Sequence, residues 1–89
     1  MTDTECMEKL KTEGYEDISV DGFAPDEEVA EHSHIKYTIQ VIIEGSLAIT
    51  EPGGATKTYQ AGEDMISPAG TRHRATAGPA GCKFIIGVK

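Results

Sequence analysis

The sequence has little positive charge and no cysteine pair. Against 15 acidic side chains it has 8 lysines and arginines, which gives a formal net charge of -7 at pH 7. A negative surplus repels nucleic-acid phosphates and anionic lipid head groups. Cys6 and Cys82 lie near opposite ends of the chain, a spacing that fits neither a redox motif nor a zinc knuckle. We therefore expect no nucleic-acid partner, no membrane partner, and two cysteines that serve as packing residues.

Long hydrophobic runs are also missing. No apolar segment approaches the ~20 residues that a membrane-spanning helix needs. Residues 1–10 lack the basic and then apolar segments of a signal peptide. These features predict a cytoplasmic protein.

The length of 89 residues leaves room for one domain with a thin core. A domain of this size buries only ~60% of the surface that its unfolded chain exposes. A bound metal or a second subunit commonly supplies the stability that such a core lacks. We expect a single domain over residues 1–89 that has one of these supports.

A short helix is predicted at about residues 3–13. Thr2 and Glu5 fit a capping box, in which each side chain pairs with a free backbone N–H at the helix start. Gly14 suits the left-handed position that follows a helix end.

Beyond Gly14 the hydrophobic pattern changes to that of an antiparallel all-β domain. Short segments rich in Ile, Val, Thr, Tyr and Phe alternate with Gly and Pro clusters. The clusters at 52–54, 68–70 and 79–81 are predicted turns, since proline fixes φ and glycine accepts a positive φ. The pattern predicts a barrel over about residues 17–89, with strands near residues 18–21, 29–34, 36–43, 46–50, 56–60, 64–67, 72–77 and 83–88. Eight short strands suit a jelly roll.

The segment 36–43 is apolar on both faces of its predicted strand. Its odd-numbered positions from Tyr37 to Ile43 are apolar, and so is Ile42. One face can line the barrel, so the other needs a cover. The amino-terminal helix and a second subunit are both candidates. We favour the second subunit, which predicts a homodimer.

All three histidines of the chain are candidate metal ligands. His32 and His34 are two residues apart on a predicted strand, so both imidazoles project from one face. His73 follows the predicted turn at 68–70 on a later strand. Imidazole is the commonest protein ligand for transition metals. The alternative is a barrel that keeps the histidines as packing or hydrogen-bonding groups without a metal.

Two segments resemble the motifs of the cupin family. Residues 26–45 resemble the first motif, Gly-x5-His-x-His-x3-Glu-x6-Gly, with both histidines and the closing glycine in place. Residues 62–77 resemble the second motif, Gly-x5-Pro-x-Gly-x2-His-x3-Asn. Four of its positions are in register: Gly62, Pro68, Gly70 and His73. The resemblance spans residues 26–77. It implies a cupin jelly-roll barrel, or double-stranded β-helix, in which His32, His34 and His73 bind the metal.

Three positions depart from the family pattern. Asp26 replaces the opening glycine of the first motif, which is tolerable because Asp adopts left-handed conformations more readily than most residues. Ala77 replaces the closing Asn of the second motif. Thr38 stands where the family has its metal-binding Glu, so it is a candidate for a fourth position or a water contact, or only a β-branched strand residue. Without the carboxylate, one divalent Zn, Fe, Ni, Co or Cu ion is expected rather than Mn.

The resemblance suggests two functions. The first is a small metal-dependent enzyme, oxygenase- or isomerase-like, that acts on a small molecule through a three-histidine site. The alternative is a binding module for a sugar or small acid, with a structural or vestigial metal and no catalysis. Gln40 shares a strand face with Thr38 and is a candidate pocket residue, or a residue at the barrel mouth in water. The acidic stretch 26–31 is expected to be a solvated loop or an acidic rim that repels anionic substrates.

Overall fold

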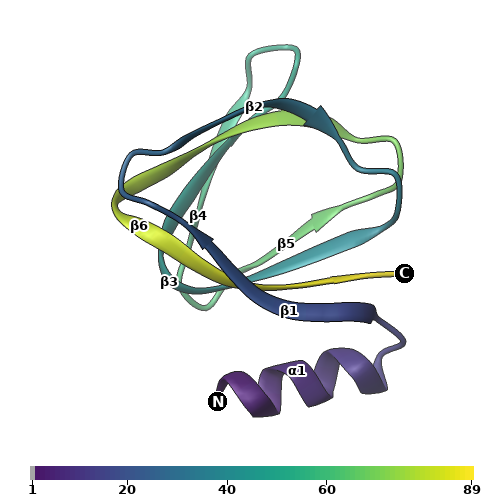
Figure 1. Cartoon of the computed structure of the whole chain (residues 1–89). Helices are drawn as coiled ribbons and strands as arrows, with labels where there is room; N and C mark the ends of the chain where they lie inside the picture. Colours follow the sequence, from purple (N-terminus) through teal and green to yellow (C-terminus); the bar gives the residue numbers. More distant parts are fainter. Residues whose placement is uncertain (1) are drawn as a thin grey trace.

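A computed structural model describes residues 2–89 as one helix and six strands, which curve into a barrel with the helix α1 against its outside (Figure 1). The elements in chain order are α1 (Asp3–Thr12), β1 (Glu16–Phe23), β2 (Glu28–Ser33), β3 (Thr38–Thr50), β4 (Thr56–Gln60), β5 (Asp64–Ser67) and β6 (Arg72–Val88). Among these residues no helix is both long enough and apolar enough to span a bilayer.

The two long strands β3 and β6 organise the barrel. They pair with each other in antiparallel register from Thr38↔Val88 to Thr50↔Arg74. On its other edge β6 pairs with β2 through its first half and with β1 through its second half, while β3 pairs with β5 and then β4. Every pairing is antiparallel, which confirms the predicted all-β barrel with a short amino-terminal helix.

Each long strand replaces two predicted strands. Segments 36–43 and 46–50 merge into β3, and segments 72–77 and 83–88 merge into β6. The predicted turn at 79–81 is therefore wrong, because these residues lie inside β6. Gly45 and Gly81 adopt φ values of 74° and 80° at adjacent places on the two strands, and register shifts flank Gly45. Such irregularities bend a strand without ending it.

The other predicted turns are confirmed. Gly54 and Gly70 have φ values of 92° and 87°, and the N–H of Gly54 donates to the Glu51 carbonyl at 2.8 Å. Asp26 has a φ of 58°, so the residue that replaces the motif glycine does adopt the left-handed conformation.

Helix α1 begins with the predicted capping box. The Glu5 N–H donates to Thr2 Oγ1 and the Thr2 N–H donates to Glu5 Oε1, both at 3.1 Å. The helix ends one residue earlier than expected, and Gly14 follows with a φ of 95°.

Thr2→Ala removes half of this capping box and should lower the free energy of unfolding by about 1 kcal/mol. Thermal unfolding followed by circular dichroism should therefore show a Tm about 5 °C lower. Thr4→Ala, an exposed change inside the same helix, serves as the control. Equal Tm values for the two variants would contradict a stabilising role for the cap.

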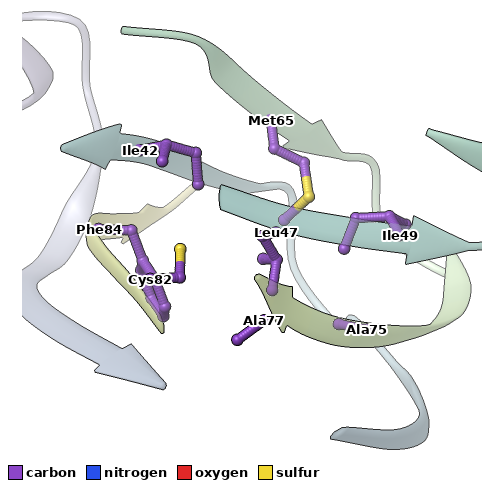
Figure 2. Packing of buried hydrophobic residues seen from close by; sticks show 8 residues of the cluster. All are labelled: Ile42, Leu47, Ile49, Met65, Ala75, Ala77, Cys82 and Phe84. Carbon is purple, nitrogen blue, oxygen red and sulfur yellow. The ribbon is translucent and has the colours of Figure 1, made fainter. Parts of the chain in front are cut away.

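Apolar side chains fill the barrel from both long strands (Figure 2). Phe84, Ile42 and Leu47 are among the most deeply buried side chains of the chain. The interior cluster consists of Ile42, Leu47, Ile49, Met65, Ala75, Ala77, Cys82 and Phe84. Val29 of β2 packs against this cluster, so the core extends to the strand that carries His32.

Helix α1 supplies the cover that segment 36–43 needs. Cys6 and Leu10 pack with Ile39 and Ile85 on the outer face of the sheet. The preference for a second subunit over the helix is therefore wrong for this part of the face, because the helix already buries it. The homodimer stays a prediction without this support.

The two cysteines belong to different clusters. Cys6 lies beneath the helix and Cys82 lies in the barrel interior, and both are free and buried. Burial raises the pKa of both thiols, so they stay protonated near pH 7. These observations support their interpretation as packing residues.

Candidate metal centre

The paired strands β2 and β6 bring the three histidines together. His32 and His73 are direct partners in the β2–β6 ladder. His34 follows the end of β2, where its N–H donates to the Thr71 carbonyl at 2.9 Å and its carbonyl accepts from the Gly70 N–H at 2.7 Å. The predicted turn at 68–70 thus holds the His34 backbone. One ring nitrogen from each histidine lies within 4.8 Å of those of the other two.

Hydrogen bonds orient the rings. His32 Nδ1 lies 2.9 Å from the Ala30 carbonyl, which can only accept, so Nδ1 is the donor and Nε2 is the ring nitrogen left for an ion. Such a second partner fixes the tautomer and the orientation of a metal-binding imidazole. His34 Nε2 and His73 Nε2 lie 3.0 Å apart, so one ring donates to the other.

Burial keeps two of the rings neutral. His73 is only 3% exposed, and burial, followed by the charges of His34 and His32, lowers its pKa to about 4. Burial, followed by the charge of His32, also lowers the pKa of His34. Near pH 7 both rings are therefore in the uncharged form that binds a metal ion.

The donor set fits a transition-metal ion. Two imidazole nitrogens bound to zinc at ~2.05 Å with a tetrahedral angle stand ~3.3 Å apart, close to the 3.0 Å between His34 Nε2 and His73 Nε2. An ion there would replace the single proton that those two nitrogens share. Among residues 2–89 no Cys, Asp or Glu joins the three histidines, so the protein supplies three ligands at most from these residue types.

Thr38 is buried, but its hydroxyl makes a local backbone hydrogen bond instead of joining the three histidines. Its hydroxyl donates to the Lys36 carbonyl at 2.9 Å, and Thr38 is not among the residues that line the cavity next to the histidines. The structure thus brings the three histidines together and leaves the candidate fourth residue with a local backbone partner.

Gln40, in contrast, lines a cavity of about 400 Å³ together with the three histidines. This residue is 6% exposed, which excludes the alternative of a side chain in open water. Eight apolar side chains make most of the wall: Phe23, Val29, Ala30, Leu47, Ile49, Ala75, Phe84 and Ile86.

Two acidic residues lie at the cavity; Glu31 belongs to the stretch expected as a solvated loop or an acidic rim, whereas Asp21 was not predicted. Asp21 and Glu31 both line it and are exposed. Glu31 forms an ion pair with Arg72 at 3.0 Å, which places this end of the acidic stretch 26–31 beside the site. Asp21 comes from β1, whose approach to the histidines depends on long-range pairing and leaves no local signal in the sequence.

No protein-family model and no curated protein matches this sequence, whereas solved structures do. A cupin-2 domain containing protein from Shewanella frigidimarina is 27% identical with a TM-score of 0.67, over 78% of this chain and 65% of that one. A cupin superfamily protein from Desulfitobacterium hafniense is also 27% identical, with a TM-score of 0.68, over 80% and 63% of the two chains. The chain has the cupin fold.

The cupin spans less than two thirds of the length of these two relatives. A protein of the DUF861 family from Thermotoga maritima has a closer length. It is 17% identical with a TM-score of 0.70, over 99% of this chain and 93% of that one. The fold thus extends over almost the whole of both chains.

Proposed function

We propose that this cupin binds one divalent transition-metal ion through His32, His34 and His73. The convergence of three imidazoles, two of them with lowered pKa values, carries the proposal. Neutral rings crowded at this distance repel through their lone pairs unless a proton or a cation lies between them.

The ligand set determines which ions are favoured. Three imidazoles and no carboxylate suit Zn, Fe, Ni, Co or Cu, while Mn and Mg prefer oxygen ligands. Thr38 offers a neutral hydroxyl, which already donates to a backbone carbonyl. We therefore expect Mn to bind more weakly than the other ions.

We further propose that the site is that of a small metal-dependent enzyme, oxygenase- or isomerase-like. Three protein ligands leave a coordination position for an exchangeable molecule, whereas structural zinc sites are closed by four. The ion would supply Lewis acidity to a small molecule in the cavity. His32, held by Ala30, and His34, held by Gly70 and Thr71, keep the ligands fixed, while the apolar wall limits water.

A binding module without turnover is the second candidate. The same cavity of about 400 Å³ could hold a small molecule without changing it. The two candidates differ in whether a ligand that exchanges on the ion is chemically altered. Product analysis with a metal-loaded sample distinguishes them once a ligand is known.

The metal proposal predicts about one divalent ion per chain in protein purified without a histidine tag. His34→Ala should reduce this content at least tenfold, because two ligands hold an ion far more weakly than three. Addition of Zn²⁺ at about 100 times its Kd should stabilise the parent by ~2.7 kcal/mol, a rise in Tm of about 10 °C or more. Elemental analysis and thermal unfolding measure both effects.

Ser33→Ala is the matched control, since Ser33 lies between the two ligands on β2 and is exposed. This variant should keep the metal content and the Zn²⁺-dependent Tm of the parent. A parent protein that holds no metal and shows no Tm change with any of the five ions would overturn the proposal.

A further inference from the structure

The wall of the cavity beside the histidines is mainly apolar. The rings of Phe23 and Phe84 have their centroids 5.3 Å apart, and Leu47 and Ile49 belong to the interior core. A sugar needs several hydrogen-bonding side chains to replace its water, since each unpaired hydroxyl in an apolar site is costly. The wall favours an apolar body instead. Its volume, about 400 Å³, is at the lower end of the range for small-molecule pockets.

The charges at the cavity have one sign. Asp21 and Glu31 line it, while no lysine or arginine among residues 2–89 does. Arg72 pairs with Glu31 but is not part of the lining. A ligand with a negative group on its body would meet two carboxylates and no cation, in a chain whose net charge is -7.

Apart from the histidines, Gln40 is the neutral polar side chain of the lining. It is 6% exposed, and no hydrogen bond of residues 2–89 involves its side-chain amide. Buried amides normally have partners. No fully enclosed side-chain nitrogen or oxygen lacks a partner in this part of the chain, so the Gln40 amide reaches the cavity, where a ligand can pair with it.

We propose that this site takes an uncharged, mainly apolar small molecule with one hydrogen-bonding head, and that the Gln40 amide selects the head. The inference rests on the proposed function, since it places the ligand beside the three histidines. It replaces the sugar or small acid of the binding-module hypothesis with a different ligand class.

A series of probes with the same head tests the proposal. Acetamide has almost no body, benzamide has an apolar ring, and 4-carbamoylbenzoate has a negative charge at the far end of the ring. The ¹⁵N-labelled full chain, with a slight excess of Zn²⁺, is titrated with each and with methyl glucoside. Benzamide should bind at least about tenfold more tightly than the other three, with shifts in the Gln40 side-chain amide and in β3 and β6 resonances.

Gln40→Leu should weaken benzamide at least about fivefold, although the variant makes the cavity more apolar. The control is Gln60→Leu, the same change at an exposed position of β4, which should leave benzamide binding unchanged. If Gln40→Leu fails to fold, the ranking of probes on the parent protein still decides the question.

Equal binding of benzamide and acetamide, equal binding of 4-carbamoylbenzoate, or shifts confined to another surface would overturn the inference. The ranking does not require the ion, so the two proposals can fail separately. A chain that ranks the probes as expected but holds no metal contradicts the proposed function alone. A chain that holds one metal but ranks the probes differently contradicts this inference alone.

Discussion

Gly45→Ala is expected to lower the free energy of unfolding by about 4 kcal/mol, a large part of the ~5–15 kcal/mol that small proteins have. Gly45 has a φ of 74°, where any other residue is strained. A Cβ at this position would also overlap the carbonyl oxygen of Gly81 on β6. The neighbouring backbone cannot easily move away, because Gly45 and Cys82 are partners in the β3–β6 ladder. Urea unfolding at 25 °C measures the loss.

Two other glycines separate the backbone strain from the collision. Gly54 has a φ of +92° and no atom within 4 Å of the place that a Cβ would take, while Gly53 has open space and no positive φ. Gly54→Ala should cost about 1 kcal/mol, and Gly53→Ala should change stability by less than about 0.5 kcal/mol. A Gly45→Ala variant no less stable than Gly54→Ala would show that the strands separate easily at this point.

The features that the sequence predicted well depend on local chemistry. The capping box of Thr2 and Glu5, the turns at 52–54 and 68–70 and the left-handed Asp26 each depend on residues a few positions apart. His32 lies on β2 as predicted, whereas His34 lies just past the end of that strand and is held by the turn at 68–70. Features of this local kind can be predicted from one sequence, because all the residues that determine them lie close together in it.

The features that the sequence predicted poorly depend on which other segment pairs with or covers the segment in question. Residues 79–81 have the composition of a turn, yet they continue β6 because β3 bends beside them at Gly45. The cover of Ile39 could not be assigned, since both a helix and a second subunit can bury an apolar face. Asp21 and Phe23 reach the cavity only through the pairing of β1 with β6.

The residues of the candidate site also include some that the sequence predicted well and some that it predicted poorly. The two motifs predicted the three histidines as ligands, because the spacing of the motif residues can be identified in the sequence. The direction of the Thr38 hydroxyl was not predictable, since it is set by the Lys36 carbonyl at the entry to β3. Whether position 38 can reach the ion is therefore a question for mutagenesis.

Thr38→Glu is expected to tighten Mn²⁺ binding at least tenfold, or about 1.4 kcal/mol. A carboxylate adds a negative charge and an oxygen ligand, both of which hard ions prefer. Position 38 lies on the same face of β3 as Gln40, which lines the cavity, and a glutamate is long enough to extend past the local hydrogen bond of the threonine. Calorimetric titration with Mn²⁺ and Zn²⁺ measures the change, which should be larger for Mn²⁺.

Thr38→Gln is the matched control, because it has the length of glutamate without the charge. Thr38 is only 3% exposed, so an unpaired carboxylate there should destabilise the metal-free protein by about 3 kcal/mol. Mn²⁺ should restore the stability of the Glu variant and not that of the Gln variant. Equal Mn²⁺ affinities for the two variants would mean that position 38 does not reach the ion. Much tighter Mn²⁺ binding by the Glu variant than by the Gln variant would show that position 38 reaches the ion and that a carboxylate there favours Mn²⁺.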